Sequence, residues 1–149
     1  MKVPPISPLL FYRDPKAALD FLERAFGFET RMMVETPDGG VVHSESLFQD
    51  HVVMVVGPPS HSAASPLDLG GKQTGHVHVQ LEDGLDLICE RARGAGARIE
   101  REPADQPYGD RIFTCLDPEG HSWSFGQTVQ TMRPGEWDGV TGTTTSSRP

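Results

Sequence analysis

The stretch LLFYRDPKAALDFLERAFG, residues 9–27, predicts a short apolar strand followed by an amphipathic helix. Asp14 is a good N-cap and Pro15 a good first helical residue, so the helix is expected to begin at this pair. Gly27 suits the left-handed conformation that ends many helices. The apolar positions that recur at helical spacing are Ala18, Leu22 and Ala25. They define one face of the helix, which we expect to pack against a sheet.

The same arrangement returns in VHVQLEDGLDLICERARG, residues 77–94, and both stretches contain the tripeptide Glu-Arg-Ala. This second stretch predicts a strand over 77–81 and a helix over 85–93 that ends at Gly94. Three further strands are predicted after each helix, at 28–36, 41–48 and 51–57, and at 97–102, 111–116 and 121–126. The chain therefore repeats a βαβββ unit, and one such unit alone could not bury both faces of its sheet.

The repeat sets the expected domain layout of an α+β protein. Two modules, at about 6–57 and 74–127, form one domain over 1–127. A linker rich in Gly, Pro, Ser and Ala joins them over 58–73, and a tail rich in Gly, Thr and Ser follows over 128–149.

The charge and hydropathy of the chain indicate which classes of partner the protein is expected to bind. Lys and Arg number 13 against 21 Asp and Glu, and a net charge of -8 disfavours nucleic-acid binding while suiting a cationic small molecule. No apolar run approaches the roughly 20 residues that span a bilayer, so no membrane partner is expected. The N-terminus lacks a signal-peptide core, and Cys89 and Cys115 form no CxxC pair, so we expect a cytoplasmic protein.

Three motifs resemble the vicinal oxygen chelate superfamily, which includes glyoxalase I, extradiol dioxygenases and bleomycin-resistance proteins. They are Phe11-Tyr12-Arg13-Asp14 with Leu19-Asp20-Phe21-Leu22, Gln106-Pro107-Tyr108-Gly109, and Asp117-Pro118-Glu119-Gly120-His121. The likeness covers about residues 6–127 and looks strongest toward bleomycin-resistance and PhnB-like glyoxalase-fold proteins. It implies two curved mixed sheets that form a cup around a ligand, either within one chain or across a dimer. We expect a homodimer, because exposed sheet edges tend to be paired and isologous pairing is common among small chains.

The resemblance also implies where a divalent metal ion would bind. Its four ligand positions fall on Ser7, Met54, His76 and Ser124. His76 alone is a good ligand among these, so no metal cofactor is expected. The alternative is a shifted site that joins His76 with Glu45 or His43.

Strand alternation predicts which side chains line the cup. If Gln49-Asp50 is a two-residue turn, Glu45 lies opposite Met54 on the cup face. In the last hairpin, we expect Thr114 opposite Trp123. Arg111, Phe113 and Cys115 then lie on the cup face. Tyr108 is expected on a loop over the cavity mouth, against a ligand or a partner subunit. Arg111 is expected to bind either a ligand carboxylate or a neighbouring acid, whereas Trp123 and Phe125 are expected in the core. The predicted ligand-binding residues are His43, Glu45, Met54, His76, His78, Tyr108, Arg111, Phe113 and Ser124.

Three functions are compatible with this pattern. The first is a metal-free protein that binds a small organic molecule, in the manner of antibiotic binding or resistance. The second is a metal-dependent lyase, isomerase or dioxygenase that uses the shifted site, or an enzyme with His76 or Glu45 as general base. The third is a non-catalytic regulatory or assembly module.

Overall fold

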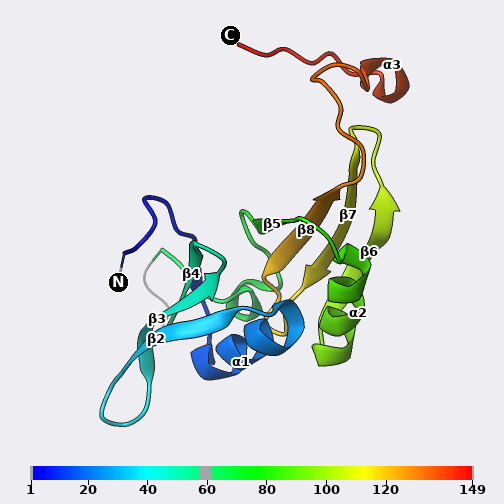
Figure 1. Cartoon of the computed structure of the whole chain (residues 1–149). Helices are drawn as coiled ribbons and strands as arrows, with labels where there is room; N and C mark the ends of the chain where they lie inside the picture. Colours follow the sequence, from blue (N-terminus) through cyan, green and yellow to red (C-terminus); the bar gives the residue numbers. More distant parts are fainter. Residues whose placement is uncertain (1, 58–61, 149) are drawn as a thin grey trace.

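A computed structural model describes residues 2–57 and 62–148, and it contains the predicted repeat (Figure 1). The first module comprises β1 (Leu9–Phe11), α1 (Pro15–Phe26), β2 (Glu29–Glu35), β3 (Val41–Phe48) and β4 (His51–Val56). The second comprises β5 (Val77–Leu81), α2 (Leu85–Ala95), β6 (Arg98–Asp105), β7 (Asp110–Leu116) and β8 (Ser122–Thr128). A 3-10 helix, η1 (Pro66–Leu69), lies between the modules, and a short helix, α3 (Asp138–Thr141), follows them. Residues 58–61 of the predicted linker lie outside the described residues.

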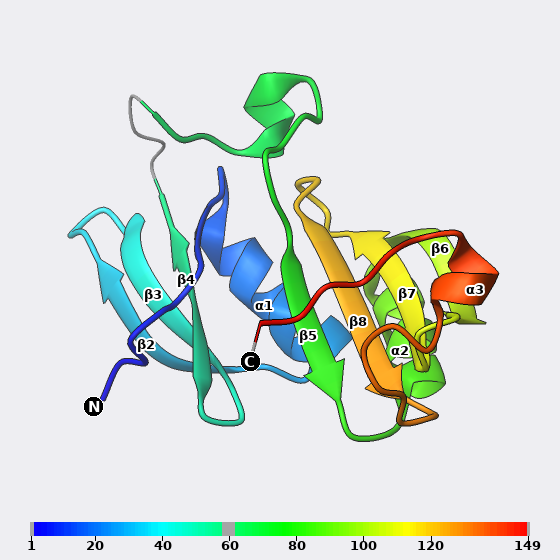
Figure 2. The ribbon, with the colours of Figure 1, turned by 90° about the horizontal axis from the view of Figure 1, so that it is seen from above.

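Each module folds into a 4-stranded mixed sheet, in the orders β1-β4-β3-β2 and β5-β8-β7-β6. The pairs β1·β4 and β5·β8 are parallel, and the other neighbours are antiparallel. The sheets lie side by side, with α1 and α2 together on one face (Figures 1 and 2). The other face of each sheet, called the open face below, is turned toward the viewer of Figure 2. Among the described residues, no helix has the length and apolar character needed to span a bilayer.

The two helices begin and end for different local reasons. The Asp14 carboxylate accepts a hydrogen bond from the backbone N–H of Ala17 at 3.1 Å, and Gly27 ends α1 with φ 73°. Both features match the expectation. The predicted end of α2 at Gly94 is wrong, because the helix continues to Ala95 and Gly96 provides the left-handed cap with φ 107°. Either glycine fits the cap pattern, and the helix closes at the later one, where the N–H of Ala97 donates to the carbonyl of Ala92 at 2.9 Å.

One hydrophobic core joins the modules. The predicted inward face of α1 is buried at Ala18 and Leu22, and the corresponding face of α2 is buried at Leu85 and Ala92. Phe26 of α1 contacts Trp123 and Phe125 of β8, with ring centroids 5.1 and 4.7 Å apart. The modules are therefore parts of a single packed unit.

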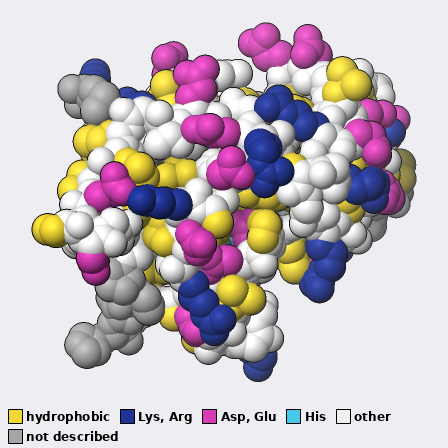
Figure 3. Space-filling model, turned by 90° about the horizontal axis from the view of Figure 1, so that it is seen from below, with side chains coloured by type: hydrophobic (Ala, Val, Ile, Leu, Met, Phe, Trp, Pro, Cys, Tyr) yellow, Lys and Arg dark blue, Asp and Glu magenta, His cyan; other side chains and the backbone are white. Residues whose placement is uncertain are grey.

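The outer surface of the helices carries mixed charge. Figure 3 shows this side with acidic and basic side chains interspersed. Several of them are paired, such as Asp20 with Arg24 and Glu102 with Arg93. Paired, exposed charges of this kind favour solubility and add little stability.

The β7–β8 hairpin is shifted by one residue from the predicted register. The backbone N–H of Asp117 donates to the carbonyl of His121 at 2.9 Å, so the loop has three residues and Gly120 takes φ 97°. Cys115, not Thr114, is therefore opposite Trp123. A shift of one residue moves every side chain of a strand to the other face. The prediction that Arg111, Phe113 and Cys115 face the cup is consequently wrong: they lie on the helix side.

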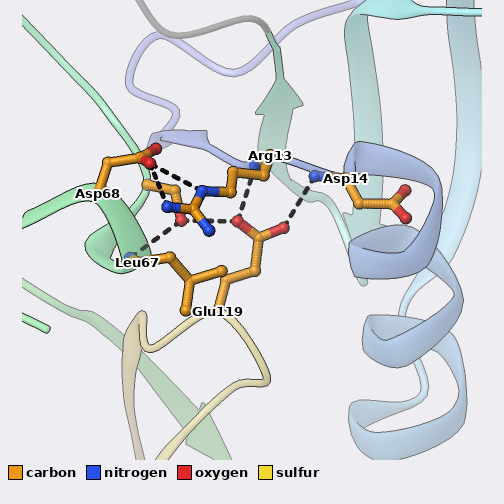
Figure 4. A network of polar contacts seen from close by, with 6 residues as sticks. Arg13, Asp14, Leu67, Asp68 and Glu119 are labelled. Atoms are coloured by element: carbon orange, nitrogen blue, oxygen red, sulfur yellow. Dashed lines mark hydrogen bonds and ion pairs between the residues drawn. The ribbon is translucent and has the colours of Figure 1, made fainter.

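Glu119 in this hairpin loop connects three segments of the chain (Figure 4). Its carboxylate accepts hydrogen bonds from the backbone N–H groups of Arg13 and Asp14, at 2.7 and 2.9 Å, and from the Ser65 hydroxyl at 2.6 Å. A carboxylate is favourable beside the first turn of α1, where the helix dipole is positive. Arg13 also pairs with Asp68 of η1. Glu119 of the second module thus fixes both the residues that lead into α1 and the linker at Ser65.

A second carboxylate, Asp117, makes a buried connection beside it. It accepts hydrogen bonds from the Tyr12 hydroxyl at 2.5 Å and from the Trp123 indole N–H at 3.1 Å. Burial raises the pKa of Asp117, and burial together with the nearby carboxylate raises the pKa of Tyr12. His121 completes the contact between modules, with its Nε2 atom 2.7 Å from the carbonyl oxygen of Phe11.

The Glu119 contacts give a stability prediction. Glu119→Ala removes the acceptor for three donors, so we expect the free energy of unfolding to fall by about 1–3 kcal/mol. Urea denaturation monitored by tryptophan fluorescence measures this change. The matched control is Glu90→Ala, which removes an exposed partner of Arg93 and should cost under about 0.5 kcal/mol. Equal losses in the two variants would contradict the proposed role of Glu119.

Candidate functional site

A row of hydrogen-bonded side chains crosses the open face of the second sheet. The Ser124 hydroxyl of β8 lies 2.7 Å from Nδ1 of His78 on β5, and Nε2 of His78 lies 2.9 Å from Oε1 of Gln80. The Gln80 amide nitrogen donates to the Asp110 carboxylate of β7 at 3.2 Å and to the Thr128 hydroxyl at 3.3 Å. Thr128 in turn donates to Asp110 at 2.9 Å. We call these five side chains the polar row.

The chemistry of Asp110 sets the direction of every bond in the polar row. A carboxylate only accepts, so the NH₂ group of Gln80 points toward Asp110 and the amide oxygen points toward His78. That oxygen requires the proton of neutral His78 on Nε2, which leaves Nδ1 to accept from Ser124. For a neutral His78 ring, the row thus favours a single tautomer, in which the Ser124 hydroxyl donates to Nδ1.

Gly126 of β8 makes room for this row. A Cβ atom at position 126 would lie 2.7 Å from Oε1 of Gln80 and 3.0 Å from Cε1 of His78. Glycine inside a strand usually marks a close approach by another group. Here it lets the imidazole and the amide lie flat across β8.

The open face of the first sheet carries a buried ion pair. The Glu45 side chain is only 3% exposed and accepts from Nε of Arg31 at 2.6 Å, while Nε2 of His43 lies 3.7 Å from its other oxygen. Glu45 is opposite Met54, as predicted from the Gln49-Asp50 turn. Arg31 was not predicted, because an irregular register between Thr30 and Met32 lets its side chain reach this face. A buried glutamate requires such a partner, which is the signal that could have identified it.

Two cavities lie between the modules, where the edges of β1 and β4 approach β5. A cavity of about 310 Å³ has mainly apolar walls, and its polar lining residues are Gln49, His51, His78 and Gln80. Its apolar lining residues are Ile6, Pro8, Phe28, Phe48, Val52, Val53, Val77 and Val79. A second cavity, of about 730 Å³, lies beside η1 and includes His76. His76 and His78 are therefore placed at different cavities.

Two predicted ligand-binding residues lie outside the open faces. Arg111 bonds to Asp86 of α2 at 2.9 Å and to Asp105 at 3.0 Å, so it forms the salt bridge that was the alternative to ligand binding. Phe113 is fully buried and stacks on Phe125 with centroids 5.0 Å apart. Both follow from the one-residue register shift of the hairpin.

Tyr108 lies on the predicted loop, beyond the end of the polar row. It is 42% exposed and contacts Trp137 of the tail edge-to-face, with centroids 6.4 Å apart. Partial burial and nearby Asp110 raise the pKa of Tyr108. Burial raises the pKa of Cys115 to about 12, so its thiol is not poised for nucleophilic attack.

The residues at the metal positions of the resemblance do not fit a divalent ion. Met54 offers a soft thioether, and the Ser124 hydroxyl is engaged with His78. Glu45, which could belong to a shifted site, is neutralised by Arg31. Within residues 2–57 and 62–148, His76 thus lacks the two or three further nitrogen or oxygen ligands that a metal centre needs.

The shifted His/Glu site is also not assembled within the described part of the chain. There, the one group of three or more His, Cys, Asp or Glu side chains close enough to share an ion is Cys89, Glu90 and Glu102. Both glutamates pair with Arg93, and the group lies on the helix side. His43, Glu45, His76 and His78 form no such group there.

Comparison with known proteins agrees with this fold. Residues 5–125 match the family described as the Glyoxalase/Bleomycin resistance protein/Dioxygenase superfamily, and the chain belongs to this family. An uncharacterized protein of Mycobacterium bovis is 33% identical over 140 residues, which are 89% of each chain. The crystal structure of TioX from Micromonospora sp. ML1 has a TM-score of 0.67 at 32% identity, over 83% of this chain and 97% of TioX.

A third similar structure is that of TnmS3, described as an antibiotic binding protein from Streptomyces sp. CB03234. Its TM-score is 0.64 at 19% identity, covering 86% of this chain and 98% of TnmS3. At this identity the likeness concerns the fold.

The polar row gives a prediction at Gly126. Gly126→Ala forces His78 and Gln80 from their positions, so we expect a loss of about 1–3 kcal/mol in stability. Long-range ¹H–¹⁵N spectra should also show loss of the single His78 tautomer. Gly94→Ala is the control, because nothing lies within 4 Å of its added methyl group and alanine favours helix. An unchanged His78 spectrum in Gly126→Ala would refute the close packing of the row.

Proposed function

We propose that this protein binds a small organic molecule on the open faces of its sheets, without a metal ion. The observation that carries the proposal is the cavity of about 310 Å³, which has mainly apolar walls and shares His78 and Gln80 with the polar row. Binding sites for small molecules usually combine a largely apolar concave surface with a few positioned polar groups. The poor metal ligands at the superfamily positions favour binding over metal-dependent catalysis.

The ligand class that we propose is an antibiotic or a similarly shaped aromatic compound. TnmS3 uses the same fold and is an antibiotic binding protein, which supports this choice. The fold does not fix the ligand, so the argument rests on the site. Its walls include two phenylalanines, Phe28 and Phe48, which suit flat aromatic surfaces.

A thermal-shift screen in excess EDTA tests the proposal. We expect at least one of bleomycin, an anthracycline and a tetracycline to raise the melting temperature in proportion to the logarithm of its concentration. Elemental analysis of the same protein should find far less than one divalent transition metal per chain. Val52→Arg, which fills the cavity with a charged side chain, should abolish the shift. Stabilisation that requires an added divalent metal would support the metal-dependent enzyme instead.

We also propose that the protein is a homodimer. The first module leaves several apolar side chains exposed on or beside the open face of its sheet: Ile6, Leu9 and Val34. The segment 129–148, which we call the C-terminal arm, projects away from both sheets in Figure 1 and crosses over β8 and β5 in Figure 2. A second copy of the chain, packed on the open faces, would cover both these apolar side chains and the C-terminal arm.

The C-terminal arm has its own internal structure. The carbonyl of Gly109 accepts hydrogen bonds from the N–H groups of Val129 and Gln130, at 2.9 and 3.0 Å, which fixes where the arm leaves β8. The Asp138 carboxylate accepts a hydrogen bond from the Thr145 N–H at 2.7 Å, and this bond lowers the pKa of Asp138. Val140 nevertheless remains 81% exposed. An ordered arm with an uncovered apolar side chain is consistent with docking on a partner subunit.

Removal of residues 133–149 tests this arrangement. We expect sedimentation equilibrium to give a dimer for the full chain and a dissociation constant at least about tenfold higher for the truncated chain. Removal of residues 146–149 is the control and should leave the dimer intact. A full-length chain that sediments near 16.3 kDa at micromolar concentration would exclude the dimer. A dimer unaffected by the longer truncation would exclude the role of the arm.

A further inference from the structure

We propose that the polar row selects a positively charged ligand, with the Asp110 carboxylate as its counter-ion. The ligand class is an amphipathic amine, with an aromatic or aliphatic body in the cavity and a protonated nitrogen at the polar row. This inference rests on the proposed function and specifies the ligand of the same site.

Asp110 is held in place by neutral groups. Gln80 and Thr128 donate one hydrogen bond each to its two oxygens, and within the described residues no basic side chain forms an ion pair with it. Each oxygen of a carboxylate can accept more than one hydrogen bond, so Asp110 retains acceptor capacity. A charged group that is fixed but not neutralised attracts an opposite charge.

The other charges near the site do not remove this preference. Glu45, on the first sheet, is neutralised by Arg31. Arg111 adjoins Asp110 in sequence but points to the helix side, where it pairs with acids of its own. Arg101 pairs with Thr114, four residues along β7 from Asp110, which corresponds to roughly 13 Å. Screening at physiological salt acts over about 8 Å, so Arg101 affects Asp110 weakly.

The sequence adds negative charge at the same end of the sheet. The last residue of β5, Leu81, pairs with Gln127, next to Thr128. Glu82 and Asp83 follow Leu81 directly and are exposed. Asp110, Glu82 and Asp83 therefore place several negative charges at this end of the sheet.

Gln80 connects the charged end to the cavity. Its side chain belongs to the cavity wall and also donates to Asp110. A ligand body among Phe28, Phe48 and Val52 can therefore direct a short side arm past Gln80 to the carboxylate.

Three matched compounds test the inference. Naphthylethylamine, naphthylethanol and naphthylpropionate share one aromatic body and a two-carbon tether, and they end in a cation, a neutral hydroxyl and an anion. Fluorescence titration at pH 7.5 should give an affinity at least about tenfold higher for the amine than for the alcohol, with the acid weakest. The preference for the amine should shrink as salt is raised, whereas the affinity for the alcohol should not.

Asp110→Asn keeps the shape of the side chain and an amide oxygen that can accept from Gln80, but it removes the charge and replaces the oxygen that accepts from Thr128 with an NH₂ donor, to which the Thr128 hydroxyl can act as acceptor. We expect it to reduce amine binding about tenfold and to leave alcohol binding unchanged. Asp20→Asn on α1 removes the same net charge on the helix side and should change neither affinity. Equal binding of all three compounds, or an Asp110→Asn variant that still prefers the amine, would overturn the inference but not the proposed function. Absence of binding by all three compounds would overturn both.

Discussion

Two carboxylates on one tight turn, Asp117 and Glu119, hold the first module against the second. Glu119 fixes the first residues of α1, and Asp117 holds the Tyr12 hydroxyl in the core. Because β1 leads into Tyr12, the same turn also positions the edge of the first sheet beside β5. The 310 Å³ cavity depends on that spacing, although none of its own lining residues makes these contacts.

The sequence was sufficient to predict the elements and the core. Helical spacing at Ala18 and Leu22, and strand alternation between turn residues, identified the βαβββ repeat and the buried helix faces. The two-residue turn at Gln49-Asp50 also gave the correct register of β3 on β4. The family followed from motifs in the same elements. These features are local, or repeat once per module, which is why one sequence could reveal them.

Features that depend on one residue of register, or on side chains from several strands, could not be predicted. A three-residue loop instead of a four-residue loop before His121 moved Arg111 and Phe113 out of the predicted site. The register irregularity that brings Arg31 to Glu45 has no sequence signature of its own. The polar row joins three strands through hydrogen bonds of defined direction, and His78 and Ser124 were identified without Asp110.

The strict division between the two faces of each sheet has an evolutionary consequence. Along β5, β7 and β8, the residues that pack on the helices alternate with those that face outward, so a change at His78, Gln80 or Thr114 removes few core contacts. Under the proposed function, natural variation at the outward positions would therefore alter which molecules are bound while folding persists. A lineage that meets a succession of toxic compounds can retain this scaffold and replace a few outward-facing side chains. The space above Gly126 limits how large those replacement side chains can be.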